Sequence, residues 1–173
     1  FGFVPSWVWV GIGHMAPERT TIALKPVYDR KGIALVVGRV TEVHPDERYV
    51  LVSLADRGGP LRLDYDYLLI ATGPKLNFAA TPGLGPEAGH TVSICTLDHA
   101  VAARDSYLAQ VRRLEQGERL TFVVGTGHPG ATCQGAALEY ISNIHKDLAR
   151  RRLRHRAELI YLSNEPALGD FGV

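Results

Sequence analysis

The sequence predicts an α/β fold, and three observations in its C-terminal half lead to this prediction. Residues 120–124 form an apolar run with the composition of a buried strand. The run breaks into a glycine-rich segment at residues 125–130, and a helix-forming stretch follows up to about Arg152. A short apolar strand at residues 159–162 comes next. This order predicts a parallel pair of strands with a right-handed crossover, the unit of Rossmann-like folds.

The first part of the chain is predicted to hold a loop, a helix and a strand. Residues 1–13 are apolar and rich in aromatic residues and glycine, which indicates a buried loop or a ligand lining more than a regular element. Residues 20–31 predict a short helix that ends at Gly32, although Pro26 must kink or shorten it. Residues 33–40 are apolar and β-branched, which predicts a buried strand.

A hairpin and a second buried strand are predicted in the middle of the chain. Residues 49–55 and 61–65 are expected to pair around a turn at residues 56–60. Residues 67–73 predict a buried strand that runs into a tight turn. Glycine and proline are frequent over residues 75–89, which indicates a connection between domains.

The ends of the two long predicted helices carry polar signals. The first helix is expected over residues 98–116, with Asp98 as its N-cap. Near the end of the second, arginines and a histidine cluster at residues 150–156. Such a cluster is favourably placed against the negative end of a helix dipole. Contact with phosphate or with anionic lipid is the alternative interpretation.

The composition describes an ordinary globular protein. The chain has 173 residues, of which 46% are hydrophobic and 21% charged, so disorder is not expected. Its formal net charge of +1 gives no reason to expect a polyanionic partner. No signal peptide, lipidation motif or transmembrane segment is recognisable. Because the chain opens without Met and stops abruptly after Val173, we expect it to be an internal piece of a longer protein.

Cys133 stands where the glycine-rich segment gives way to a helix. Partial positive charge at a helix N-terminus favours the reactive thiolate form of a cysteine. The alternative is a small apolar thiol that packs at the start of the helix. Cys95 is the second of two cysteines in the chain, and two cysteines do not establish a disulfide framework.

Residues 125–130 have the spacing Gly-x-Gly-x-x-Gly after a strand. Glycines at these positions permit a tight turn and let a pyrophosphate approach the helix N-terminus. Two features argue against dinucleotide binding. Pro129 stiffens the turn, and Glu165, the nearest acidic residue after the second strand, lies too far along the chain for the usual ribose contact. The pattern therefore indicates the fold more strongly than the ligand.

The tripeptide Ala-Thr-Gly at residues 71–73 ends a predicted strand. A small residue and a glycine at this position allow the backbone to come close to a flavin, although a plain strand end is the alternative. The tripeptide resembles the Ala-Thr-Gly segment of flavoproteins with two dinucleotide-binding domains, and its combination with the preceding hairpin and the glycine-rich strand that follows favours this interpretation over a plain strand end.

Four segments, in the same order along the chain, resemble the sulfide:quinone oxidoreductase family. They are Phe3-Val4-Pro5-Ser6, residues 65–76, residues 93–100 and Gly130-Ala131-Thr132-Cys133; Ser163-Asn164-Glu165-Pro166 also fits. The resemblance covers nearly the whole chain. Flavocytochrome c sulfide dehydrogenase and type II NADH dehydrogenase share the Ala-Thr-Gly tripeptide, but the two cysteine-bearing segments favour the quinone-linked enzyme.

The resemblance implies a Rossmann-like fragment of an FAD flavoprotein. Residues 1–80 would be part of an FAD-binding domain that includes the β-hairpin, and residues 81–92 would be a connection. Residues 93–173 would be part of a second, NAD-like dinucleotide-binding domain, with its first β–α–β unit.

Catalytic roles are implied for four residues. Cys133 matches one cysteine of a redox-active pair beside the flavin, whose partner lies outside this chain, and Cys95 matches a further cysteine with an accessory role. His99 matches a histidine proposed to move protons, and Glu139 matches an acidic residue near the active cysteine. The structural alternatives are that His99 simply follows the Asp98 cap and that Glu139 is a carboxylate on the surface of a helix.

The cofactor that the resemblance implies is FAD, and no metal is expected. Arg39 and Val40 match the backbone that holds the adenine end of FAD, and Thr72 and Gly73 fall near the flavin. Pro5 and Ser6 are also expected to contact the cofactor.

Two departures from the family pattern bear on the chemistry. Asp170 stands where the family often has a histidine, which replaces one proton-relay candidate with a carboxylate of lower usual pKa. His128 and Pro129 stand where the family usually has small apolar residues.

The implied reaction is oxidation of sulfide to polysulfide sulfur, with two electrons passing through FAD to a membrane quinone. The parent protein would bind the surface of a bacterial inner membrane through its C-terminal segments. No nucleic-acid partner is expected, and a homo-oligomer is possible. The chain lacks the N-terminal glycine-rich loop for FAD and the second cysteine of the pair. We therefore expect this chain by itself to be soluble, to bind FAD poorly and to be inactive.

Two other functions stay open at this point. The chain could belong to an NAD(P)H-dependent FAD oxidoreductase similar to type II NADH dehydrogenase, with a nicotinamide cofactor on the glycine-rich turn. It could also be a redox-inert association domain in which Cys133 is merely packed.

Overall fold

The computed structural model describes residues 1–56 and 58–167, and its contacts divide the chain into two compact units. One unit joins Phe1–Ile22 with Leu76–Val173, and the other is Ala23–Lys75. Residues 1–22 therefore pack with the C-terminal part of the chain. The functional domains expected at residues 1–80 and 93–173 stay a prediction.

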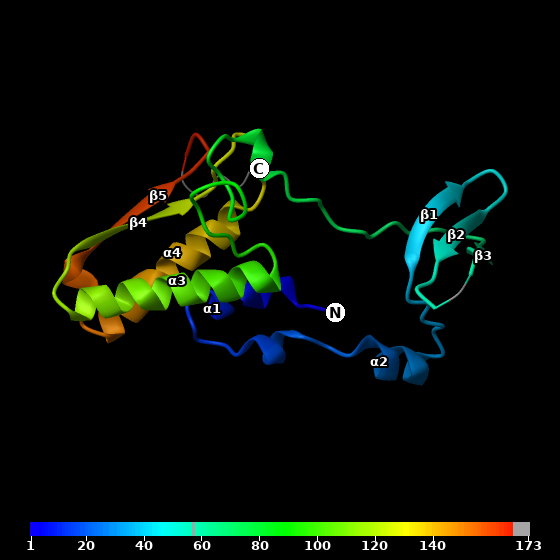
Figure 1. The fold of residues 1–173 in the computed structure, drawn as a ribbon, viewed down its shortest axis with the longest axis horizontal. Coiled ribbons are helices and arrows are strands. Elements are labelled where there is room, and N and C mark those ends of the chain that lie inside the picture. The colour runs from blue at the N-terminus through cyan, green and yellow to red at the C-terminus, as the bar shows by residue number, and fades with distance from the viewer. Residues whose placement is uncertain (57, 168–173) are drawn as a thin grey trace. The chain divides into compact units, whose positions relative to one another are not determined.

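The first unit contains the strand–helix–strand motif that the sequence predicts (Figure 1). Strands β4 (Leu120–Gly125) and β5 (Ala157–Leu162) pair in parallel, from Leu120 opposite Ala157 to Gly125 opposite Leu162. Helix α4 (Gln134–Arg150) connects the strands and contacts both. The prediction of a Rossmann-like α/β fold is confirmed.

Helix α4 buries one side along its length because its apolar residues recur at helical spacing. The apolar residues that it buries are Ala137, Tyr140, Ile141, Ile144 and Leu148. Leu148 is fully buried and packs in one cluster with Leu114 of helix α3 (Leu97–Glu115). The core of the unit thus lies where the two helices and β4 meet.

The N-cap of α3 differs from the sequence prediction. Thr96, and not Asp98, precedes the helix, and its Oγ1 accepts a hydrogen bond from the backbone N–H of His99 at 3.2 Å. Asp98 lies in the first turn, where its negative charge favours the positive end of the helix dipole. Two neighbouring residues with capping side chains made the exact start of this helix hard to predict.

Residues 1–13 are more regular than the predicted loop. They form a 3₁₀ turn, η1 (Val4–Ser6), and a one-turn helix, α1 (Trp7–Val10), and a second 3₁₀ turn, η2 (Pro17–Thr20), follows. Helix α1 is too short for its spacing to be recognised, but its burial agrees with the prediction, since Val8 and Val10 are buried. Contacts to α3 and α4 supply this burial.

The second unit is a short helix followed by an antiparallel sheet. Helix α2 (Leu24–Lys31) ends at Gly32, whose φ of 66° is left-handed, as the predicted stop requires. Strand β2 (Tyr49–Ser53) pairs with β3 (Leu61–Asp64) in the predicted hairpin. Strand β1 (Arg39–His44) adds a third strand beside β2, which the sequence did not indicate.

Two predicted buried strands are wrong in this structure. Residues 33–38 are exposed and form no strand, and only the last two residues of the predicted strand 33–40 enter β1. Residues 67–73 are also exposed and irregular; Leu69, for example, is 89% exposed. Apolar and β-branched composition reports strand propensity, but a strand also needs a neighbour, and neither segment pairs with any described residue.

The remaining segments match the sequence in part. The predicted connection at residues 75–89 contains a short 3₁₀ turn, η3 (Phe78–Ala80). Another such turn, η4 (Arg154–Arg156), leads into β5. Among the described residues, no helix is long and apolar enough to cross a membrane. The same residues hold no group of His, Cys, Asp and Glu arranged to bind a metal ion.

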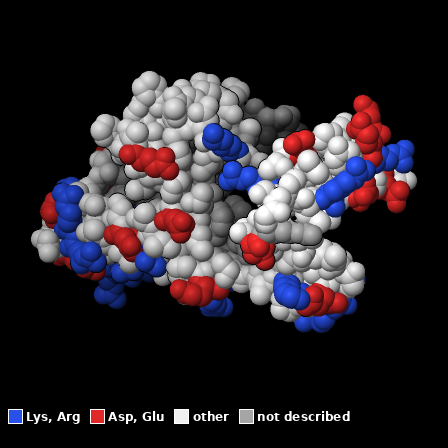
Figure 2. All heavy atoms as spheres, turned by 45° about the vertical axis from the view of Figure 1, so that its right-hand side comes forward, with Lys and Arg blue, Asp and Glu red and all other residues white. Residues whose placement is uncertain are grey.

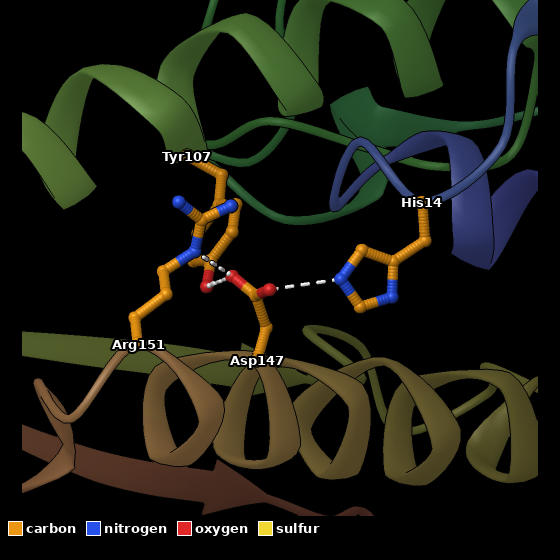
Figure 3. A network of polar contacts seen from close by, with 4 residues as sticks. All are labelled: His14, Tyr107, Asp147 and Arg151. Atoms are coloured by element: carbon orange, nitrogen blue, oxygen red, sulfur yellow. Dashed lines mark hydrogen bonds and ion pairs between the residues drawn. The ribbon is translucent and has the colours of Figure 1, made fainter.

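A buried carboxylate, Asp147 of α4, joins three separate segments of the first unit (Figure 3). Its Oδ2 accepts hydrogen bonds from the hydroxyl of Tyr107 on α3, at 2.6 Å, and from Nε of Arg151, at 2.7 Å. Its Oδ1 lies 2.8 Å from Nε2 of His14, in the segment that follows α1. The Asp147 side chain is only 5% exposed, so its charge depends on these partners.

The hydrogen bonds to Asp147 offset the cost of burying its negative charge. Burial by itself disfavours the ionised form of Asp147, but the hydrogen bonds from Tyr107, His14 and Arg151 hold its pKa below the ordinary value. Burial and the hydrogen bond to Asp147 raise the pKa of the Tyr107 hydroxyl, so this tyrosine stays a neutral donor. The network is therefore a permanently charged link at neutral pH.

We expect Asp147→Asn to destabilise the first unit by roughly 1–3 kcal/mol, because the neutral amide loses the charge-assisted hydrogen bonds from Tyr107, His14 and Arg151. Urea unfolding at pH 7 measures the change. The matched control is Asp105→Asn on α3, whose ion pair with Arg104 is 63% exposed on the carboxylate side and should cost less than about 1 kcal/mol. Equal losses in the two variants would contradict a special role for the buried carboxylate.

The same network predicts a pH dependence. A carboxylate with a lowered folded-state pKa adds stability above its unfolded pKa, near pH 4, and the protein loses that stability as the pH falls further. The free energy of unfolding of the wild type should therefore drop more steeply below about pH 4 than that of Asp147→Asn. Parallel curves for the two proteins would show that Asp147 is not the group responsible.

Candidate functional site

The candidate site lies at the C-terminal ends of β4 and β5, in the loop that leads to α4. Gly125 and Leu162 end the paired region, so residues 126–133 and 163–164 leave the sheet at the same edge. Ligands of open α/β sheets bind at this edge, outside the carboxyl ends of the strands. The fold therefore places Cys133 at the edge that such proteins use for chemistry.

Asn164 fixes the glycine-rich loop by binding it at several points. Its Nδ2 donates to the carbonyl oxygens of Pro129, at 2.9 Å, and Ala131, at 3.0 Å. Its Oδ1 accepts from the Thr126 hydroxyl at 2.9 Å and from Nε2 of Gln134, at the start of α4, at 3.1 Å. One half-buried amide thus sets the shape of the loop between strand and helix.

The glycines of the loop are surrounded by the chain itself. A Cβ at Gly127 would lie 2.6 Å from Cδ1 of Leu84, and the carbonyl of Gly127 accepts a hydrogen bond from the Thr81 hydroxyl at 3.1 Å. A Cβ at Gly125 would clash with the backbone of Leu162. These glycines permit close packing of backbone and side chains, and Leu84 fills the space beside the second glycine of the motif.

Cys133 is the N-cap residue of α4, as its predicted place at the start of the helix requires. Its carbonyl accepts a hydrogen bond from the N–H of Ala137 at 3.2 Å, and its side chain makes no capping bond. The thiol is free and exposed. The alternative of a packed, buried thiol is therefore not what the structure shows.

Cys95 and His99 lie near the start of α3. Cys95 is also a free, exposed thiol, and its backbone N–H donates to Oγ of Ser93 at 3.1 Å. The ring of His99 lies 5.9 Å, between centroids, from the ring of Phe78. Its Nδ1 is buried and has no hydrogen-bond partner among the described residues. A buried ring nitrogen without a partner is available for an incoming group.

Glu139 is an exposed residue of α4 and has no hydrogen bond or ion pair within the described chain. No hydrogen bond or ion pair in that part of the chain joins any two of the four residues predicted to be catalytic, Cys133, Cys95, His99 and Glu139. Their roles stay predictions. Asp170, the predicted departure from the family pattern, lies outside the described residues.

The six residues predicted to contact FAD fall in both units. Pro5 and Ser6 belong to η1, where the Ser6 hydroxyl donates to the carbonyl of Phe3 at 2.7 Å. In the second unit, Arg39 and Val40 begin β1, and Thr72 and Gly73 lie in an exposed, irregular segment. Nothing in the structure tests these assignments.

Asn164 and Leu84 shape the site, and the sequence did not reveal their roles. The signal for Asn164 was an asparagine two residues after the end of a strand, a residue type whose amide often binds nearby backbone. Leu84 gave no such signal, because it lies in a segment that resembles a plain connection. Its contact with Gly127 joins residues 43 positions apart.

Comparison with known proteins shows similarity to one family over the whole chain. A sulfide-quinone reductase of Aquifex aeolicus (strain VF5) is 32% identical over 173 residues, which are 100% of this chain and 37% of that protein. The crystal structure of the sulfide:quinone oxidoreductase from the same hyperthermophilic bacterium superposes with a TM-score of 0.79 at 30% identity, over 99% of this chain and 37% of that one. No family model matches the chain. The chain therefore spans little more than a third of the length of these relatives.

We expect Asn164→Ala to loosen the glycine-rich loop, because four side-chain hydrogen bonds to the loop and to Gln134 are lost, each worth about 1 kcal/mol. Amide hydrogen exchange at residues 126–134 should become faster. Asn77→Ala is the matched control, since the exposed side chain of Asn77 makes no capping bond. Unchanged exchange in the loop of Asn164→Ala would show that the strand ends alone shape it.

Proposed function

We propose, from the similarity to sulfide-quinone reductase along the whole chain, that this chain is part of a flavoprotein that oxidises sulfide to polysulfide sulfur and passes the electrons through FAD to a quinone. The observation that carries the proposal is the coincidence of that similarity with an exposed thiol at the start of a helix. As a class of activity, the similarity supports an oxidoreductase.

In the proposed reaction Cys133 is one half of a disulfide whose other half lies outside the chain. A sulfide anion attacks that disulfide, a new sulfur–sulfur bond forms on the partner cysteine, and Cys133 leaves as a thiolate. Its place at the N-terminus of the 17-residue helix α4 favours that leaving group, because the helix dipole stabilises negative charge there. Exposure of the thiol gives the sulfide anion access.

FAD, when bound, would accept the electron pair that comes from sulfide and would pass it on to the quinone. The residues of this chain are compatible with that cofactor. Gly73 has a φ of 71°, and a Cβ placed there would meet nothing within 4 Å, so its backbone is open to an approaching ring system. Pro5 and Ser6 expose a 3₁₀ turn, and we assign both, with Arg39, Val40 and Thr72, to cofactor binding.

His99 and Glu139 would handle protons in this scheme. The unpartnered Nδ1 of His99 is free to exchange a proton with a group that enters beside Phe78. Glu139 presents its carboxylate one and a half turns along α4 from Cys133, on the exposed surface of the helix. The parent protein would meet quinone at a bacterial inner membrane surface, as a peripheral protein.

The glycine-rich loop gives little support to a nicotinamide-dependent activity. Leu84 fills the space beside Gly127, the glycine that would otherwise let a pyrophosphate approach the backbone. Oxidation of NADH by the full-length protein, without a response to sulfide, would favour the related type II NADH dehydrogenase activity instead.

We expect Cys133→Ser in the full-length protein to abolish sulfide-dependent quinone reduction, a loss of at least 10³-fold, because the reactive sulfur is removed. Stopped-flow measurement of flavin reduction by sulfide gives the readout, with FAD content determined in parallel. Cys95→Ser is the matched control, since Cys95 is equally a free, exposed thiol but matches a family cysteine whose role is accessory or varies between members, and it should keep most of the activity. Full activity in Cys133→Ser would leave the redox-inert association domain as the better interpretation.

The 173-residue polypeptide by itself should bind FAD poorly, because the glycine-rich loop expected to hold the FAD pyrophosphate is not in this sequence. It should show no turnover, because the second cysteine of the proposed pair is not in this sequence either. Absorbance of the purified polypeptide after incubation with FAD, and an assay with sulfide and a soluble quinone, measure both properties. A yellow preparation that oxidises sulfide would refute this expectation.

A further inference from the structure

A cavity lies at the opposite edge of the β4–β5 pair from Cys133. The cavity has a volume of about 410 Å³ and opens where the two strands begin. Because Leu120 and Ala157 start the parallel register opposite one another, the turns that precede both strands meet at this edge. The lining includes Arg119 from one turn and His155 and Arg156 from the other.

The backbone brings the basic groups close together. Gly117, in the turn before β4, has a φ of 105°, which favours glycine, and a Cβ there would lie 3.0 Å from Nη1 of Arg156. The guanidinium of Arg156 therefore rests against the turn that carries Arg119. Its Nε lies 3.4 Å from Nε2 of His155, so these two side chains lie side by side.

The basic groups of the cavity are not neutralised by acidic neighbours. Within the part of the chain that the structure describes, neither Arg119 nor Arg156 forms an ion pair. The carboxylate in the lining, Glu158, accepts a hydrogen bond from the Thr121 hydroxyl at 3.0 Å. Two permanent positive charges thus face one negative charge, in a hollow that concentrates their field.

The surroundings add further positive charge. Arg150 and Arg152, just before the turn to β5, are exposed and also lack ion pairs within the described residues. In Figure 2, blue Lys and Arg side chains, with some acidic ones among them, gather at the left, the end at which α3 and α4 finish in Figure 1. Compensation of the helix dipole accounts for Arg150, in the last turn of α4, but not for Arg119 or Arg156, which lie outside both helices.

We propose that this cavity is a phosphate-binding site, taking either free phosphate anions or the phosphate of a lipid headgroup. Guanidinium groups bind phosphate oxygens through two parallel N–H donors, and two arginines from separate turns can contact one phosphate from two sides. His155, whose Nε2 accepts from Nε of Arg156, lines the cavity at the same edge. The site is distinct from the sulfide chemistry proposed above and does not depend on it.

Isothermal titration of the full-length protein with inorganic phosphate, at constant ionic strength, tests the first source. We expect the double variant Arg119→Ala/Arg156→Ala to bind phosphate at least tenfold more weakly than the wild type. Arg119→Ala by itself, at an exposed residue, replaces the double variant if the latter does not fold. Arg150→Ala removes the same charge from the same end but outside the cavity, and its affinity should stay within twofold of wild type.

Cosedimentation with vesicles tests the second source. If the site takes a lipid headgroup, the double variant should bind phosphatidylglycerol vesicles at least tenfold more weakly, and binding to phosphatidylcholine vesicles should not change. A loss confined to soluble phosphate identifies a free anion as the ligand, and a loss confined to the anionic vesicles identifies the headgroup. The proposal fails if neither loss occurs, or if Arg150→Ala weakens binding as much as the double variant, since net charge alone would then explain the attraction.

Discussion

The buried carboxylate of Asp147 is the interaction on which the arrangement of the first unit depends. A lone buried charge would cost several kcal/mol, so the position is tenable only when donors from other segments reach it. Those donors come from His14 after α1, Tyr107 on α3 and Arg151 at the end of α4. The Tyr140 hydroxyl adds a second tie, donating to the carbonyl of Gly11 at 2.9 Å. Helix α4 is therefore fixed in rotation and in position along its axis.

Because α4 is fixed, its two ends define two chemically different places. Cys133 caps one end beside the glycine-rich loop, and arginines follow the other end beside the start of β5. Because β4 and β5 pair in parallel, both carboxyl ends lie on the side of the loop that leads to Cys133, and both amino ends lie beside the cavity. One strand–helix–strand unit thus carries the proposed sulfur site and the proposed anion site at its opposite ends, without any further element.

Residue spacing and turn chemistry predicted the parts of the fold that depend on residues close together in the sequence. The β4–α4–β5 unit, the hairpin of β2 with β3 and the stop of α2 at Gly32 all follow from residue spacing and turn chemistry. The exposure of residues 33–38 and 67–73 could not be predicted from their apolar composition, because burial as strands requires strand neighbours that the described residues do not supply. Apart from Arg151, which lies four positions from Asp147, the partners of Asp147 and Asn164 were equally beyond prediction, since these contacts join residues at least 30 positions apart.

The contact between Leu84 and Gly127 gives the glycine-rich loop an independence that nucleotide-binding loops lack. In a dinucleotide-binding turn, the second glycine lets the backbone come close to a pyrophosphate, which then packs against the turn. Here a side chain of the same polypeptide supplies that packing at every moment. The loop that leads to the thiol of Cys133 is therefore packed by the polypeptide itself, and no bound nucleotide is needed to hold its shape.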